Sequence, residues 1–154
     1  MAALNVSKIT DPGVIAKIYQ DPYISRVGHD HRAAGPIIDP LATYWGAYSD
    51  GQLVGAFLLI ESGYIDVDVH ALLFRDALPD SRLLGQLFLA EVFHNPEIQR
   101  ATAQVIEGLE SASNYCLRLG FKYEGFKRNA CMRGGQLVGI HMLGMTRNEW
   151  EASV

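Results

Sequence analysis

Hydrophobic and polar residues alternate along the segment YIDVDVHALLF, residues 64–74. Successive side chains of a strand point to opposite faces, so this period of two predicts a strand with one buried face. The expected core face carries Ile65, Val67 and Val69, and the polar face carries Asp66, Asp68 and His70. The strand therefore presents a row of ionisable groups.

Four other segments predict strands joined in pairs by tight turns. TYWGAY (43–48) and QLVGAFLLI (52–60) flank the sequence Ser49-Asp50-Gly51, and YEGFKRNACM (123–132) and LVGIHMLGMT (137–146) flank RGGQ (133–136). Gly, Asp and Asn tolerate the positive φ of hairpin turns, so each pair predicts an antiparallel hairpin. ATAQVIEG (101–108) predicts a further strand.

Three segments have helical spacing instead. Thr10-Asp11-Pro12 predicts a helix start, with the helix ending by Asp21-Pro22. A second helix is expected over 81–93, and a third ends at Gly120, which suits a left-handed C-terminal position. The apolar faces are Val14, Ile15, Ile18 and Tyr19; Leu83, Leu84, Leu87, Phe88 and Val92; and Tyr115, Leu117 and Leu119. Residues 24–40 have no sustained period and predict a loop or short broken helix beside a substrate mouth.

The order of these elements predicts the fold class. A strand-helix-strand crossover lies inside a run of hairpins, which predicts a mixed α/β sheet of six to seven mostly antiparallel strands with flanking helices. No repeat or linker interrupts residues 1–154, so we expect a single domain. Sheets of this kind bind ligands where neighbouring strands diverge, at their carboxyl ends and beside a helix N-terminus. That rule points to the end of segment 64–74 and the start of the Ser81 helix.

Composition excludes several classes of function. The 154 residues are 49% hydrophobic and 19% charged with a net charge of -4, so there is no basic excess for nucleic acid. No apolar run reaches the roughly 20 residues of a membrane span, and the N-terminus lacks the pattern of a signal peptide. Cys116 and Cys131 have no metal-type spacing and fit reduced thiols. We therefore expect a cytoplasmic protein with no nucleic-acid or membrane partner.

The histidines of GHDHR, His29 and His31, raise the question of a metal site. They alternate on a polar segment with only Asp30 nearby, and His94 and His141 lie far away in sequence. A metal site needs a third spaced ligand, so no metal is predicted here.

A family resemblance rests on four features: the strand order, PDSRLLGQ opening a central helix, the ending LRLGFKYEGFKR, and the terminal MTRNEW. Together they resemble the GNAT N-acetyltransferases over roughly residues 43–150, and especially a compact, often phage-encoded subgroup. The resemblance implies acetyl-CoA as acyl donor and direct transfer of the acetyl group to a primary amine in a ternary complex. The acceptor would be a small molecule or a peptide amine, and a homodimer is left open.

The resemblance also implies a cofactor site. The family's loop pattern of Arg or Gln, two residues, Gly, one residue and Gly or Ala is matched at Arg82 and Gly85 and missed at Leu87. Backbone N–H groups at a helix N-terminus would there approach a pyrophosphate. The implied cofactor-binding residues are Leu72, Leu73, Phe74, Ser81, Arg82, Leu83, Leu84, Gly85, Gln86 and Asn114. The same residues also fit a plain amphipathic helix capped by Asp80 or Ser81.

His70 and Asp68 are the candidate catalytic residues. The family often carries its base on the polar face of the strand before the cofactor loop. Imidazole titrates near neutral pH, and Asp68 lies two residues away on the same face. The alternative is that Asp66, Asp68 and His70 are merely solvated.

Two departures from the family pattern bear on catalysis. The Tyr that commonly protonates the leaving thiolate is replaced by Cys116, and the Asn that contacts the pantetheine arm is replaced by Leu109. A thiolate can leave without an acid, because thiol pKa values lie near 8.5. Two alternatives to an enzyme therefore remain: a non-catalytic protein of the same fold acting in phage assembly or partner binding, and a CoA-binding regulator.

The alternatives make different structural predictions. An enzyme needs a cofactor tunnel at Gly85 and a polar strand face opening into it. An assembly protein is expected to fill that tunnel with Leu83, Leu87 or Phe74 and to expose an apolar patch elsewhere. Asp30, Asp66 and Asp68 near the mouth would favour a cationic acceptor.

Overall fold

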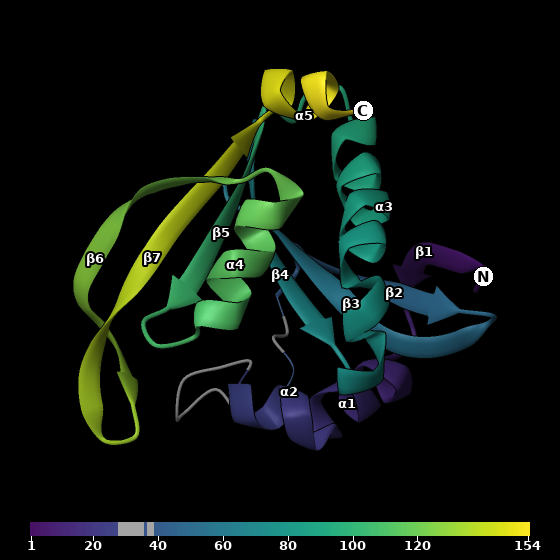
Figure 1. Cartoon of the computed structure of the whole chain (residues 1–154), viewed down its shortest axis with the longest axis horizontal. Coiled ribbons are helices and arrows are strands. Elements are labelled where there is room, and N and C mark those ends of the chain that lie inside the picture. The colour runs from purple at the N-terminus through teal and green to yellow at the C-terminus, as the bar shows by residue number, and fades with distance from the viewer. Residues whose placement is uncertain (28–35, 37–38) are drawn as a thin grey trace.

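The computed structural model describes residues 1–27, 36 and 39–154, and its centre is one seven-stranded sheet (Figure 1). The strands lie in the order β1-β2-β3-β4-β5-β7-β6. Their bounds are β1 Leu4–Ile9, β2 Ala42–Ser49, β3 Gln52–Glu61, β4 Asp66–Leu73, β5 Arg100–Ile106, β6 Lys122–Arg133 and β7 Gln136–Thr146. Among the strands of the described residues only β4 and β5 pair in parallel, and helix α3 (Ser81–His94) makes the crossover between them. The predicted mixed sheet with its central crossover is confirmed.

The two expected hairpins are present, because their turn residues adopt the required positive φ. Asp50 (φ 49°) and Gly51 (φ 81°) join β2 to β3, and Gly134 (φ 59°) and Gly135 (φ 77°) join β6 to β7. Two-residue turns with both φ values positive match the right-handed twist of the strands. The sequence signal at both turns was therefore sufficient.

Helices cover both faces of the sheet (Figure 1). Helices α3 and α4 (Glu110–Leu119) pack against one face, where Phe57 of β3 stacks on Phe88 of α3 with ring centroids 4.6 Å apart. Helices α1 (Pro12–Gln20) and α2 (Pro22–Val27) pack against the other face, where the hydroxyls of Tyr19 and Tyr44 lie 2.9 Å apart. Burying apolar area on both faces is the main stabilising contribution to such a sheet.

Helix α1 begins where the sequence predicts. Asp11 caps it, with its carboxylate oxygen accepting a 2.8 Å hydrogen bond from the Gly13 N–H, and Pro12 occupies the first turn. After Asp21 the chain enters α2 (Pro22–Val27), so a short helix covers the start of the segment 24–40 that was expected to be a loop or a short broken helix. His29, Asp30 and His31 lie outside the described residues.

Three elements were missed. Strand β1 has only six residues and pairs with β2 at the sheet edge, so its alternating pattern is too short to stand out. Helix α5 (Arg147–Ser153) follows Thr146, whose side chain and that of Glu149 form a capping box. That signal can be read from the sequence TRNE. A 3-10 helix, η1 (Arg75–Asp80), fills the connection from β4 to α3.

Four apolar side chains were assigned to the wrong environment, and two of them, Leu83 (54% exposed) and Leu87 (39% exposed), belong to the expected apolar face of the 81–93 helix. Ile65, expected in the core, is 54% exposed because β4 begins one residue later. Leu117 is 49% exposed, because α4 turns Ala112, Tyr115, Cys116 and Leu119 to the core instead. In each case the element exists as predicted, and its boundary or its rotation about the helix axis differs.

No helix in the described part of the chain is long and apolar enough to cross a membrane.

Candidate functional site

The two parallel strands at the centre of the sheet diverge. Register pairs between β4 and β5 run from Asp66↔Arg100 to Asp68↔Thr102, although both strands continue beyond these residues. Figure 1 shows their arrowheads pointing apart. Main-chain groups of β4 after Asp68 therefore face an opening rather than β5.

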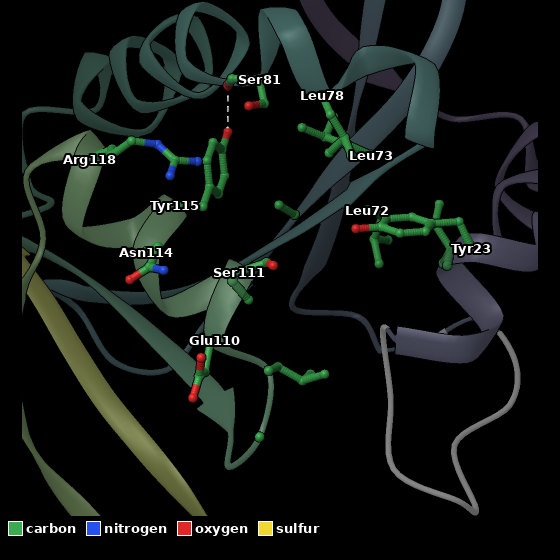
Figure 2. A pocket seen from close by; sticks show the side chains of 15 residues that line it. Tyr23, Leu72, Leu73, Leu78, Ser81, Glu110, Ser111, Asn114, Tyr115 and Arg118 are labelled. Carbon is green, nitrogen blue, oxygen red and sulfur yellow. Dashed lines mark hydrogen bonds between the residues drawn. The ribbon is translucent and has the colours of Figure 1, made fainter.

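A cavity of about 580 Å³ lies at this opening. Its walls come from the end of β4, the start of α3, the loop after β5, helix α4 and helix α2, and Figure 2 shows Tyr23 and Tyr115 on opposite sides. The lining residues are Tyr23, Ile24, Ala71, Leu72, Leu73, Leu78, Ser81, Gly108, Leu109, Glu110, Ser111, Ala112, Asn114, Tyr115 and Arg118. One wall is apolar and the wall formed by α4 is polar.

The candidate catalytic residues lie on β4, just before the cavity. His70 precedes Ala71, which lines the cavity, but neither His70 nor Asp68 is itself part of the lining. Both side chains are partly buried and share a sheet face with Leu72, on the side covered by α1 and α2. The structure therefore brings Asp68 and His70 together beside the opening.

Burial sets the ionisation of this pair. Burial lowers the pKa of His70, with the charge of Asp68 opposing the shift. Burial also raises the pKa of Asp68, opposed by the His70 charge and by a hydrogen bond with the Gln104 side chain on β5. Near neutral pH the imidazole is therefore held in its neutral form.

The start of α3 meets the cavity at Ser81. Ser81 is buried, and its carbonyl oxygen accepts a 2.7 Å hydrogen bond from the Tyr115 hydroxyl (Figure 2). Leu72 and Leu73 also line the cavity. Of the other residues assigned to the cofactor, Arg82, Leu83 and Gln86 are exposed and absent from the lining, and Leu84 is in the core.

Gly85 has a packing role in this structure. A Cβ at this position would overlap the Tyr115 hydroxyl and lie 2.8 Å from Leu119 Cδ2, so its missing side chain lets α3 approach α4. The Arg82-to-Gly85 pattern thus lies within the first turns of the helix, directly after Ser81, because η1 occupies the preceding connection. Leu83 and Leu87 are both exposed, so neither fills the cavity as an assembly protein would require.

Phe74 faces a different hollow. Its N–H donates to the Val54 carbonyl oxygen at 3.0 Å, which ties it to β3. It lines a second cavity of about 400 Å³ between α2 and η1, together with Asp21, Pro22, Tyr23, Arg75 and Asp76. Arg75 lies over the Tyr23 ring in this hollow, with its guanidinium carbon 5.3 Å from the ring centroid.

Helix α4 contributes several residues that the sequence analysis did not assign. Ser111, Tyr115 and Arg118 line the cavity with the predicted Asn114. Their spacing of three, four and seven residues places them on one stripe of the helix. That polar spacing in SASNYCLR (111–118) was the available signal, and the apolar assignment of Leu117 obscured it. Tyr23, Ile24 and Leu78 come from elements that carry no motif.

Cys116 and Leu109 occupy the positions of the family's Tyr and Asn. Leu109 lines the cavity as an apolar residue. Cys116 packs against the core, and burial raises the pKa of its thiol to about 11. The thiol therefore points away from the cavity lining and stays protonated at neutral pH.

Within the described residues, no group of three or more His, Cys, Asp or Glu side chains could hold a metal ion.

No protein-family model matches the sequence. Spermidine N-acetyltransferase from Vibrio cholerae, in complex with CoA and spermine, has a TM-score of 0.80 and 13% identity over 96% of this chain and 98% of that chain. This chain has the GNAT fold.

A second GNAT neighbour shows how far the likeness extends. A crystal structure named only "Probable acetyltransferase" has a TM-score of 0.64 and 18% identity over 73% of this chain. This chain spans 66% of that protein's length. At these identities the likeness concerns the fold, and the phage-encoded subgroup stays a prediction.

Proposed function

We propose that this protein is a GNAT N-acetyltransferase that transfers an acetyl group from acetyl-CoA to a primary amine in a ternary complex. The observation that carries the proposal is the divergence of β4 and β5 after Asp68 and Thr102, which opens into a 580 Å³ cavity at the start of α3. Structural neighbours of the same fold include a spermidine N-acetyltransferase in complex with CoA and spermine. The acceptor proposed here is a small molecule or peptide amine.

The residues of the cavity fit acetyl-CoA. Leu72, Leu73 and Leu78 offer an apolar wall for an extended arm, and Ser111 and Asn114 offer hydrogen-bonding groups along α4. The main chain of β4 beyond Asp68 faces the opening, where its N–H and C=O groups can pair with amides of such an arm. Acetyl-CoA would supply the activated thioester carbonyl.

His70 is proposed as the general base, with Asp68 as a positioning residue. A primary amine is mostly protonated at neutral pH, because its pKa lies near 10 for an alkyl amine and near 8 for a peptide α-amine, so the acceptor must lose a proton before it attacks. The burial that lowers the pKa of His70 keeps its imidazole neutral and able to accept that proton. The amine nitrogen then bonds to the carbonyl carbon as the carbon–sulfur bond breaks.

The leaving sulfur departs as a thiolate in this proposal. Cys116 is partly buried and packs against the core, where burial raises the pKa of its thiol, and it does not line the cavity. The Tyr115 hydroxyl already donates to the Ser81 carbonyl oxygen. Neither side chain is therefore assigned as the acid that protonates the sulfur.

Isothermal titration with acetyl-CoA, desulfo-CoA and pantetheine tests the cofactor site. We expect micromolar binding of acetyl-CoA, about -8 kcal/mol. Release of free thiol from acetyl-CoA is then measured with polyamines, small monoamines and lysine peptides as acceptors. Absence of acetyl-CoA binding at millimolar concentration would overturn the proposal.

A second candidate function is a CoA-binding regulator without transferase activity. The core position of Cys116, where the family commonly has its acid, favours it. The two candidates differ in one outcome: a regulator binds acetyl-CoA in the titration but releases no thiol with any amine.

A further inference from the structure

We propose that Arg118 on α4, and not the motif residue Arg82 on α3, binds the phosphate groups of the cofactor. The inference rests on the proposed function, because it assigns a residue to the same cavity. It also differs from the expectation from the motif, which places Arg82 among the cofactor-binding residues.

Arg118 is the last of the polar residues of α4 that line the cavity. Ser111, Asn114 and Arg118 line the cavity at spacings of three and four residues, so they follow one side of the helix. With a rise of 1.5 Å per residue, Arg118 lies roughly 10 Å along the axis from Ser111. Figure 2 shows its side chain extending beside the Tyr115 ring toward the start of α3. Burial raises the pKa of the Tyr115 phenol and the charge of Arg118 opposes that shift, which is consistent with the two side chains lying close together.

Arg82 is separated from the cavity by the packing of the helices. It is exposed and absent from the lining, although its neighbour Ser81 is part of it. The turn from Arg82 to Gly85 is closed on the α4 side by Tyr115 and Leu119, which fill the space at Gly85. A ligand in the cavity therefore meets the side of α3 at Ser81 and does not meet the Arg82 side chain.

The charge of Arg118 is available to an anion. None of the ion pairs in the described part of the chain includes Arg118, and it is the only Lys or Arg among the described residues that line the cavity. The lining carboxylate, Glu110, lies eight residues earlier, roughly 12 Å along α4. A planar guanidinium binds phosphate oxygens in a bidentate manner, so this end of the cavity suits a phosphate group.

This charge distribution orients the ligand. The phosphate end would lie at Arg118, near the start of α3, and the acyl end would lie near Ala71, where β4 leaves β5. An extended arm between them follows Ser111 and Asn114. The acetyl group then arrives beside His70, the residue before Ala71.

Binding of CoA, 3′-dephospho-CoA and pantetheine to Arg118→Gln and Arg82→Gln tests the assignment. Both arginines are exposed and both substitutions remove one charge, so Arg82→Gln is a matched control. We expect Arg118→Gln to weaken CoA binding by about tenfold or more, while Arg82→Gln changes it by less than about threefold. Pantetheine, which lacks phosphate, should bind both variants as it binds the unchanged protein.

Salt dependence gives a second readout that does not depend on activity. CoA affinity of the unchanged protein should fall as salt rises, and the fall should be shallower for Arg118→Gln than for Arg82→Gln. Equal CoA affinity of Arg118→Gln and the unchanged protein would overturn the assignment and leave the proposed function standing. If the unchanged protein does not bind CoA, both are overturned.

Discussion

The Tyr115 hydroxyl donates a 2.7 Å hydrogen bond to the carbonyl oxygen of Ser81, and this bond joins α4 to the first residue of α3. The same hydroxyl lies over Gly85, one turn further along α3. The two helices can make this contact because position 85 has no side chain. A glycine that matches a cofactor motif in the sequence is therefore needed for helix packing in the structure.

Gly85→Ala should destabilise the protein by about 1–3 kcal/mol. Alanine has the higher helix propensity, but its Cβ would overlap the Tyr115 hydroxyl and crowd Leu119, and such overpacking usually costs that amount. Urea denaturation followed by circular dichroism measures the loss.

Tyr115→Phe provides the matching double-mutant cycle. Removal of the hydroxyl takes away the nearest atom, so Gly85→Ala should cost less in the Tyr115→Phe background than alone. A Gly85→Ala protein as stable as the unchanged one would contradict this packing role.

Protonation of His70 should limit both stability and activity in acid. Burial lowers the pKa of the folded imidazole below 6.5, so the unfolded chain binds a proton first as the pH falls. By linkage, the free energy of unfolding then decreases as pH drops through that range. His70→Gln should flatten this pH dependence between about pH 7.5 and pH 5.5.

The rate of acetyl transfer should also depend on the protonation state of His70. The acidic limb of kcat/KM is expected below pH 6.5, and Asp68→Asn should move it lower still, because the carboxylate opposes the shift. Unchanged transfer by His70→Gln at all pH values would remove His70 as the base.

Cys116 should be chemically inert and dispensable for transfer. Its thiol is packed against the core, and burial raises its pKa to about 11, so little thiolate exists at neutral pH. Iodoacetamide should modify Cys116 slowly in the native protein and rapidly after denaturation, as peptide mass spectrometry can follow separately from Cys131. Cys116→Ala should leave kcat/KM and its pH dependence unchanged; loss of an alkaline limb that the unchanged protein shows would identify the thiol as an acid.

Arg147→Met should destabilise the protein by about 2 kcal/mol. Arg147 donates hydrogen bonds to the carbonyl oxygens of Phe93, Asn95 and Ile98 at 2.7–2.9 Å, which fastens α5 to the connection between α3 and β5. Methionine keeps the length of the side chain and removes every donor.

Glu151→Gln is the control for Arg147→Met. The Arg147 nitrogen and the Glu151 oxygen of this ion pair are 3.5 Å apart, and the Glu151 side chain is 55% exposed. Loss of the ion pair should therefore lower the free energy of unfolding by about 0.5 kcal/mol or less. Equal thermal-unfolding shifts for the two variants would show that the carbonyl contacts contribute little.

The fold could be predicted where local signals agree with the tertiary structure. The turn at Asp50-Gly51 and the glycines at 134 and 135 determine two hairpins, and Gly120 ends α4 in the left-handed conformation with φ 108°. Strand β1 could not be found in the same way, since its stability depends on pairing with β2. The periodic pattern of a six-residue edge strand is too short to indicate it.

The site was predicted in part, for a related reason. Ser81, Leu72, Leu73 and Asn114 line the cavity, because the end of β4 and the start of α3 follow from the order of the elements. The Arg82-to-Gly85 pattern suggested cofactor contacts for a turn that the structure packs against α4. A short motif specifies residue types, but it does not specify how the chain before it connects to the preceding strand. Here η1 forms that connection, so α3 begins at Ser81 and the motif lies inside the helix.

The short parallel pairing of β4 with β5 also has a consequence for the motions of the sheet. Two antiparallel blocks, β1–β4 and β5–β7–β6, are joined over the residue pairs from Asp66↔Arg100 to Asp68↔Thr102. Local opening is easiest where the fewest interactions must break, so amide protons along this seam should exchange with solvent sooner than those between β2 and β3. A ligand that bridges the two strands would hold the blocks together, and slower exchange at the seam would then record binding without any chemical turnover.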